Sequence, residues 1–454
     1  MKLLFSRCLM GIGNGLRRHS VAVQRAQWIL VLFYVVLLVT PALLPLPDNQ
    51  ARMLDNLTLL AQFVFWGIWW PFVLLSVVLF GRMWCGLLCP EGALSEWASQ
   101  HGMGRGIPRW MRWAGWPSVG FLATTLYGQL ISVYDYAQAA LLILGGSTIA
   151  AMLVGFFYGR GKRVWCRYLC PVSGVFALLA KLAPMHYRVS EERWQANLPP
   201  HLPAPNCAPL LDIRRMRGAS ACHACGRCSG QRDAVRLIAR SSNEEIVHLG
   251  EHGNLWEARL LLYGVIGLAM AAFQWTISPW FIALKQSMAE WLVAHDQLWP
   301  LQADAPWWVL THYPQVNDAF TWLDGLSICL YLVLGALLLG GGIHLLLIAG
   351  SVLAGKPLAF ARHLALCLVP TGAAGLFLGL SSTTVKLLRY EGLQLLWVNQ
   401  ARAVLIVAAG LWSLYLGWRV CTQLPWQSRQ APMLALLLSN TLLGYSWWLQ
   451  FWGW

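Results

Sequence analysis

The stretch GRMWCGLLCPEGA, residues 81–93, determines how the rest of the chain is interpreted. It returns as KRVWCRYLCPVSG, residues 162–174, with arginine, tryptophan, leucine and proline at matching places around two cysteines. Residues four apart share one face of a helix, so each copy presents two thiols together. Two such pairs facing each other would make a four-sulfur site, which suits an iron–sulfur cluster or zinc. The four cysteines are Cys85, Cys89, Cys166 and Cys170.

A proline follows the second cysteine of each pair, at Pro90 and Pro171. Proline lacks an N–H and breaks a helix, so the backbone there is free to turn round a cluster. The pattern leaves open whether these four cysteines share one cluster or each pair joins cysteines from the other cysteine-rich motif. Eight cysteines provide ligands for two cubanes by either route.

The composition is that of a polytopic membrane protein. Of 454 residues, 57% are hydrophobic and only 11% are charged, whereas a soluble domain carries roughly 25% charged residues. The net charge is +14, and its Lys and Arg gather in loops between apolar runs, as expected for cytoplasmic loops facing lipid rather than for nucleic-acid binding. The clustered cysteines avoid the predicted outer loops, which favours ligation over disulfides.

We predict an all-α membrane protein of about nine transmembrane helices, each near 20 residues, with a small cytoplasmic ferredoxin-like iron–sulfur domain. Residues 1–27 form a basic cytoplasmic N-terminus, and 28–183 a core of about four membrane helices bearing both CxxxCP motifs. Residues 184–257 form the cytoplasmic iron–sulfur domain. Residues 258–454 hold about five further helices, with an outer loop at 284–324. The predicted spans are 28–46, 59–80, 116–133, 139–158, 260–282, 326–348, 364–380, 401–419 and 433–451.

A second cysteine motif, CHACGRC, lies in the predicted cytoplasmic domain. The spacing of Cys222, Cys225 and Cys228 is the core of the bacterial ferredoxin run, which wraps a cubane. The fourth cysteine of that run is missing, because SGQRD follows. Cys207, after the flexible segment PPHLPAPN, is the replacement that we assign to this cluster. A structural zinc site is the alternative for the same residues.

The WCxxxCP repeats at membrane-helix ends, followed by this cysteine-rich domain, resemble the NapH/NosR type of membrane polyferredoxin and the related iron–sulfur accessory proteins of cbb3-type oxidase. The resemblance covers residues from about 59 to 240. It implies [4Fe–4S] clusters and electron exchange between the quinone pool and another redox protein. The ligands that it implies are Cys85, Cys89, Cys166, Cys170, Cys222, Cys225 and Cys228. The chain departs from the family in having one ferredoxin-like run and in adding helices after it.

Other residues give weaker signals. His344 and His363, on neighbouring predicted helices, are able to hold a b-type haem, although His363 stands at a membrane edge where a histidine is ordinary. His295, Asp296 and His312 on the outer loop are candidates to receive protons from a quinol. The arginines around CHACGRC are able to dock an acidic partner such as a flavodoxin or ferredoxin, or to attract anionic lipid.

These patterns predict a multi-pass protein of the bacterial inner membrane that carries electrons through two [4Fe–4S] clusters. The expected partners are membrane lipid, a quinone or quinol, and a cytoplasmic or membrane redox protein, with no nucleic acid. A quinol-oxidising enzymatic activity is left open. The alternatives are a maturation factor that reduces a metal for a respiratory oxidase, and a zinc-bearing membrane scaffold.

Overall fold

The computed structural model describes residues 2–48, 50–196 and 205–454, with side chains from residue 6 onward. The chain folds into two units, each assembled from three segments. The first unit comprises Met1–Leu37, Phe72–Gly120 and Gly146–His252, and the second comprises Leu38–Pro71, Phe121–Gly145 and Gly253–Trp454. All eight predicted cluster cysteines belong to the first unit.

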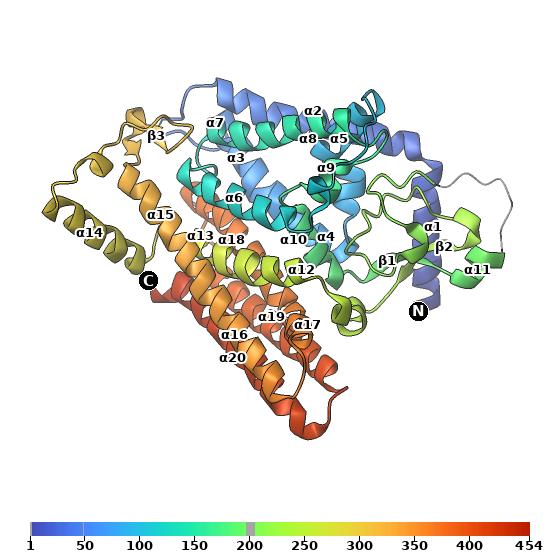
Figure 1. Ribbon diagram of the computed structural model, residues 1–454. Helices are drawn as coiled ribbons and strands as arrows, with labels where there is room; N and C mark the ends of the chain where they lie inside the picture. The colour runs from blue at the N-terminus through green and yellow to red at the C-terminus, as the bar shows by residue number, and fades with distance from the viewer. Residues whose placement is uncertain (1, 49, 197–204) are drawn as a thin grey trace. The chain divides into compact units, whose positions relative to one another are not determined.

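The first unit is mainly helical (Figure 1). Its elements are α1 (Lys2–Arg18), η2 (Trp84–Leu88), α5 (Pro90–Gln100), η3 (Trp110–Arg112), α8 (Gly146–Phe157), α9 (Val164–Tyr168), α10 (Ser173–Leu179), η5 (Ala180–Leu182), β1 (Met185–Val189), α11 (Glu191–Ala196), η6 (Ile213–Arg215), η7 (Gln231–Asp233), β2 (Val235–Ala239), η8 (Glu245–Leu249) and η9 (Gly250–His252). Three helices continue from one unit into the other: α2 (Ser20–Leu43), α4 (Trp70–Phe80) and α6 (Trp116–Leu130).

The second unit is also helical, with one short two-stranded sheet. Its elements are α3 (Leu57–Gln62), η1 (Phe63–Trp69), α7 (Ala137–Ala140), η4 (Leu141–Gly145), α12 (Leu255–Arg259), η10 (Leu260–Leu268), α13 (Ala269–Gln274), α14 (Pro279–Ala294), η11 (Trp299–Leu301), β3 (His312–Tyr313), η12 (Pro314–Val316), β4 (Asp318–Ala319), α15 (Trp322–Gly335), η13 (Ala336–Gly340), α16 (Gly341–Leu353), α17 (Leu358–Leu366), α18 (Val369–Tyr390), α19 (Val398–Cys421), α20 (Trp426–Trp448) and η14 (Leu449–Gly453).

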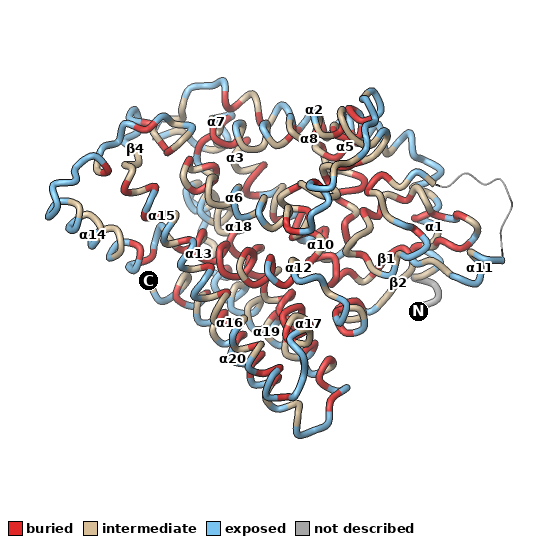
Figure 2. Tube along the Cα trace, in the orientation of Figure 1, coloured by how far each residue is buried: buried red, intermediate tan, exposed pale blue. Residues whose placement is uncertain are grey.

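Several helices are long and apolar enough to cross a membrane, as expected for a membrane protein. Within the described residues there are 6 such helices, or up to 7 if the bent pair α17–α18 counts as one span. They are Ser20–Leu43, Leu57–Phe80, Ala137–Phe157, Leu255–Gln274, Trp322–Leu353 and Val398–Cys421. The apolar window of Leu255–Gln274 is 72% buried, against 17% for Ala137–Phe157 (Figure 2), so the two spans have very different surroundings.

Two of the predicted spans are not among these helices. The run at 116–133 forms α6, which has 15 residues and covers about 22 Å at 1.5 Å per residue, less than the ~30 Å hydrocarbon core. The run at 433–451 covers most of α20 and the start of η14, and it contains the polar residues Ser439, Asn440 and Gln450. The predicted outer loop also differs in detail, because Pro279–Ala294 forms the helix α14. A count of nine spans therefore stays a prediction.

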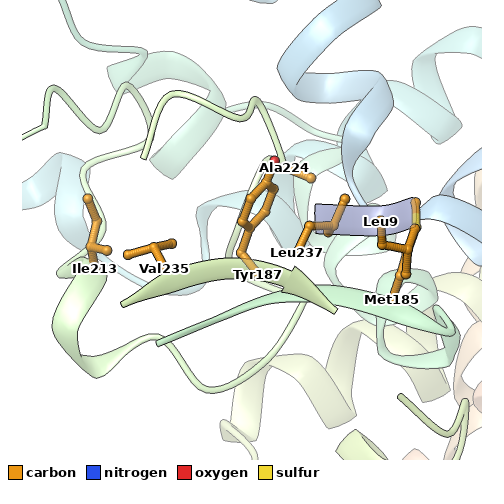
Figure 3. Close-up of a cluster of buried hydrophobic side chains, with 7 residues drawn as sticks. All are labelled: Leu9, Met185, Tyr187, Ile213, Ala224, Val235 and Leu237. Carbon is orange, nitrogen blue, oxygen red and sulfur yellow. The ribbon is translucent and has the colours of Figure 1, made fainter. Parts of the chain in front are cut away.

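A two-stranded antiparallel sheet organises the extramembrane part of the first unit. β1 pairs with β2 from Met185↔Ala239 to Val189↔Val235. Because side chains alternate along a strand, Met185 and Tyr187 share one face and pack with Leu237 and with Leu9 of α1 (Figure 3). The basic N-terminal segment, predicted only as a cytoplasmic tail, is thus a helix with a face in this core.

Small residues allow the helices of the first unit to approach closely. A Cβ placed on Gly155 of α8 would lie 2.3 Å from the carbonyl oxygen of Ser95 on α5. Likewise, a Cβ on Gly102 would lie 2.1 Å from the carbonyl oxygen of Phe156. Real Cβ atoms do not come this near to a carbonyl oxygen, so glycine is required at both positions. These contacts fix the segment that follows the first CxxxCP motif against the helix that precedes the second.

Candidate iron–sulfur site

The first CxxxCP motif ends one helix and begins the next. Cys85 lies in the π-helical turn η2, and Cys89 stands in extended backbone as the N-cap of α5. Pro90 occupies the first helical position, where its missing N–H costs nothing. The N–H of Gly92 donates to the Cys89 sulfur at 3.4 Å. This hydrogen bond, together with the position at a helix N-terminus, stabilises negative charge on the Cys89 sulfur.

The second copy has a related but shorter local structure. Cys166 lies in α9, and the N–H of Cys170 donates to the carbonyl oxygen of Trp165 at 2.9 Å. Pro171 then interrupts the helix before α10 begins at Ser173. In both copies the proline separates two helical turns, as the sequence predicts, and the two thiols lie on either side of the break.

The four cysteines of the two copies, the first quartet, come together in the interior. All four are free thiols, and only Cys89 is more than slightly exposed. Burial, and next the charges of Cys166 and Cys85, raise the pKa of Cys89. Burial also raises the pKa of Cys170, with contributions from Glu91, Cys166, Cys89 and Cys85. Each thiol therefore lies within electrostatic range of the others, which is the arrangement that the repeat predicts.

The two matching arginines brace the copies crosswise. Arg163 of the second copy is buried and donates from Nη1 to the carbonyl oxygen of Cys85 in the first copy, at 2.5 Å. Arg82 of the first copy donates to the Ser173 hydroxyl at 2.8 Å, and this hydroxyl donates to the carbonyl oxygen of Cys166 at 2.8 Å. Each copy thus positions the backbone beside the first cysteine of the other.

The CHACGRC segment forms a tight loop with left-handed backbone. Ala224 has φ 48°, and Gly226 has φ 78°. The N–H of Ala224 turns inward and donates to the Cys222 sulfur at 3.3 Å. Alternation of right- and left-handed residues points successive N–H groups to one side, and such concave turns are common around iron–sulfur groups. The loop geometry therefore suits a negatively charged sulfur-ligated cluster.

Cys207 lies near this loop, as the assignment of the fourth ligand requires. We call Cys207, Cys222, Cys225 and Cys228 the second quartet. Burial, and next the charge of Cys225, raise the pKa of Cys207. Burial, with Cys225 and Cys207, raises the pKa of Cys228 to about 12. Most of the PPHLPAPN segment that leads to Cys207 lies outside the described residues.

The two quartets are neighbours, and one glycine brings them together. Gly86 stands between Cys85 and Cys89, and a Cβ on it would lie 2.0 Å from the carbonyl oxygen of His223 and 2.9 Å from the nitrogen of Cys225. Only glycine lets the two loops approach this closely. The charge of Arg163 also acts on Cys166 of one quartet and on Cys225 of the other.

Sequence reasoning missed the polar residues that hold this assembly. The Glu96 carboxylate is buried between Arg163, at 2.8 Å, and Arg227 of the cysteine loop, at 2.5 Å. Although burial opposes ionisation, these two guanidinium groups hold the pKa of Glu96 below its usual value. The sequence signal was weak: one acidic residue on a helix directly after the first motif, in a chain with few acidic residues.

The N-terminal helix α1 covers the cysteine loop, which was also not predicted. The Asn14 side chain pairs with the Ser229 hydroxyl at 2.9 Å, and Arg17 donates to the Ser229 carbonyl oxygen at 2.8 Å. Small residues again allow the approach, because a Cβ on Gly13 would lie 3.0 Å from the Ser229 hydroxyl. The amphipathic pattern of residues 2–18 was the available signal.

The remaining candidates lie in the second unit. His344 on α16 pairs through Nδ1 with the Tyr263 hydroxyl at 2.9 Å, and His363 is buried on α17. His295 stacks on Trp291 after α14, and Asp296 and His312 lie further along the predicted outer loop. These contacts leave the haem and proton-transfer hypotheses untested. Cys329, Cys367 and Cys421 also lie in this unit, apart from both quartets.

Four thiols in each quartet are a donor set that suits an iron–sulfur cluster. Among the described residues, no three His, Cys, Asp or Glu side chains lie close enough together to hold one metal ion. A cubane is larger than an ion, and each of its irons takes one cysteine, so its ligands stand further apart. Burial, opposed in part by Arg163, raises the pKa of Cys166 to about 12. Such buried thiols become thiolates when iron replaces their protons.

Comparison with known families agrees with this chemistry. The chain matches a family described as a 4Fe-4S binding domain over residues 62–108 and 140–190. Each matched segment contains one CxxxCP motif, so the match falls on the two copies of the internal repeat. No curated protein and no solved structure matches the chain. The match supports an iron–sulfur protein that binds a [4Fe–4S] cluster, and the apolar helices suggest a membrane protein.

Proposed function

We propose that this protein transfers electrons between the quinone pool and a redox protein through two [4Fe–4S] clusters. The observation that carries the proposal is the adjacency of the two quartets across Gly86. The first cluster would be held by Cys85, Cys89, Cys166 and Cys170, and the second by Cys207, Cys222, Cys225 and Cys228.

Buried, neighbouring one-electron sites suit electron relay. A bound [4Fe–4S] cluster supplies one-electron uptake and release at low solvent exposure. A quinol gives two electrons and two protons as it becomes a quinone, so two one-electron sites match its electron count. The surrounding arginines, Arg82 and Arg163, place positive charge beside the first quartet, which favours the more negative, reduced state of a cluster.

The second quartet would face the partner protein. Arg214, Arg215 and Arg217 are exposed on the segment between Cys207 and Cys222. Their charge would attract an acidic redox protein and orient its approach. We place this face in the cytoplasm and the helices in a bacterial inner membrane, because Lys and Arg accumulate on the cytoplasmic side of such membranes.

The proposal is tested by anaerobic purification followed by iron, sulfide and EPR analysis during a redox titration. We expect about eight irons and eight sulfides per chain, four of each for each cubane. Cys166→Ala removes one EPR signal and Cys225→Ala a different one, whereas the matched variant Cys8→Ala, outside both quartets, changes neither. Stoichiometric zinc without labile sulfide contradicts the proposal.

Electron exchange is tested on the same anaerobic protein with a reduced quinol analogue. The expected result is reduction of the clusters by quinol, or their reoxidation by quinone, in wild type and in Cys8→Ala. If neither reaction occurs while cupric ion reoxidises the reduced clusters, the quinone role is wrong and metal reduction becomes the better hypothesis.

A further inference from the structure

A cavity of about 410 Å³ in the first unit opens beside both quartets. It is lined by the end of α1, the first turns of α2, one face of α5 and the cysteine loop. Gly86 and Cys225 form its inner wall, so the cavity touches the loop of the first quartet and a cysteine of the second. Its volume is in the range of small-molecule sites, about 300 to 1,000 Å³, and is too small for a protein segment.

The polar wall of this cavity consists of residues that mostly bond to other protein groups, and it also carries two exposed glutamines. Gln24 on α2 and Gln100 on α5 both line it and are exposed, and their side-chain amides bond to no other described residue. Gln27 is buried between them and the cysteines, and its amide donates to the Gly86 carbonyl oxygen at 3.1 Å. Two amides that line one small cavity suit a ligand with two carbonyl or hydroxyl oxygens.

The other wall is formed by the start of a candidate membrane span. α2 is a candidate span from Ser20 to Leu43, and the cavity is lined by its first turns, including Val21 and Trp28. Trp28 meets Trp97 of α5 edge to face at 6.2 Å, and both line the cavity. Tryptophan pairs of this kind mark the interface of the bilayer, where apolar chains and polar head groups meet. A ligand in this cavity would place its polar end against the glutamines and its apolar part beside Trp28 and Trp97.

We propose that this cavity binds the head group of a quinone or quinol, with Gln24 and Gln100 on its oxygens and the isoprenoid chain leaving past Trp28. The inference rests on the proposed function, which supplies the ligand class. What it adds is the location of the site, where a ring with two oxygens is held between α2 and α5, against Gly86 and Cys225. The ion pairs of Glu96 with Arg163 and Arg227 keep α5 and the cysteine loop in place around it.

The test is photolabelling of the anaerobic, cluster-loaded protein with an azidoquinone, followed by peptide mapping. We expect label on residues 20–28 and 93–100, and competition by unlabelled quinone. Gln24→Leu and Gln100→Leu remove exposed amides and keep the fold, and each weakens competition about five- to tenfold, the effect of one hydrogen bond. Ala93→Phe fills the cavity and abolishes specific label, whereas Ala26→Phe, on the exposed side of α2, does not.

The outcomes separate the site from the function. If quinol reduces the clusters but competable label maps elsewhere, for instance around Tyr263 and His344, the site is wrong and the proposed function stands. If quinol neither reduces the clusters nor competes for label, the proposed site and the proposed function are both wrong. Label on these helices that unlabelled quinone does not displace reflects partition into lipid and overturns the site.

Discussion

Single residues without reactive groups decide whether the cysteines meet. Gly86 and the pair of arginines at matching repeat positions carry no electrons, yet they set the distance between the quartets. The sequence could predict which cysteines belong to each motif, because their spacing within a motif is local, but it left open how the motifs combine into clusters. It could not predict the role of Gly86, since that role depends on the loop at His223 and Cys225, which is far away in the chain.

Replacing Gly86 with alanine should separate the two loops. The added Cβ would stand 2.0 Å from the His223 carbonyl oxygen, and backbone on both sides leaves no flexible group to move. We expect Gly86→Ala to lose the EPR signal of the second quartet and about half of the iron, four of roughly eight atoms. The control is Gly106→Ala, where a Cβ meets nothing within 4 Å. Retention of both signals in Gly86→Ala would show that the loops do not need this approach.

A buried carboxylate makes the stability of the first unit depend on pH. Glu245 pairs with Arg240 at 2.5 Å and accepts N–H bonds from Ala219 and Ser220, just before the cysteine loop. Burial alone would raise its pKa, but Lys181 and Arg240 hold the pKa below its usual value. A lowered pKa means that this stabilisation is complete above the unfolded value of about 4.3 and is lost as the pH falls through the folded value.

We therefore expect Glu245→Gln to destabilise the protein by about 3 to 5 kcal/mol at pH 7, since it leaves buried cations uncompensated. The measurement is the midpoint of thermal unfolding in detergent at several pH values. The difference in unfolding midpoint between wild type and Glu245→Gln should narrow as the pH falls below 4. The midpoint of Glu244→Gln should equal that of wild type at every pH. A gap that is constant with pH would mean that the charge of Glu245 does not matter.

At the scale of elements, the N-terminal helix does more than anchor the chain. α1 contributes Leu9 to the core of the β1–β2 sheet and covers the segment after Cys228 through Asn14 and Arg17 (Figures 1 and 3). The sequence predicted a basic cytoplasmic tail here, since clustered arginines are the stronger signal. The role of the apolar face of α1 could not be predicted, because the sheet that it packs against is built from residues 185–239.

Displacing α1 should expose the second quartet to solvent. Leu9→Asp places a charge at a position that is 3% exposed, at a cost of more than about 2 kcal/mol to docking. Ile12→Asp is the matched variant on the outer face, where the side chain is 45% exposed. We expect the visible absorption of the clusters to bleach several-fold faster in air for Leu9→Asp only. Equal rates in the two variants would mean that α1 does not protect the cluster.

At the scale of the whole molecule, the site constrains the path of the chain through the membrane. The two CxxxCP copies contact each other through Arg163 and Cys85, so they belong on the same membrane face. The chain must cross an even number of times between them, yet only one helix of sufficient length and hydropathy, Ala137–Phe157, lies between the copies. If Ala137–Phe157 crosses the membrane, a second crossing between the copies would have to come from α6 with the residues that follow it, and the predicted span at 116–133 stays a prediction.

This threading is checked with a membrane-impermeant thiol reagent on single cysteines introduced at Gly230, Asp304 and Ser132, in intact and in inverted vesicles. The expected result is reaction of Gly230→Cys only from the cytoplasm, and of Ser132→Cys and Asp304→Cys only from outside. Reaction of all three from one side would show that the crossings are misassigned. A reporter after Trp454 decides whether α20 crosses, since an outside terminus requires that it does.

The crosswise bracing by Arg82 and Arg163 also sets an order of biogenesis. Cys85 and Cys89 leave the ribosome long before the arginine that positions them, and Gly86 meets its partner loop only after Cys228 has been made. The first quartet is complete only when residue 170 has been made and the second only when residue 228 has been made, so cluster delivery to each quartet must await a chain of that length. Until then the early thiols stand exposed to oxygen and to stray metals, and their protection falls to the cell's assembly factors rather than to the fold.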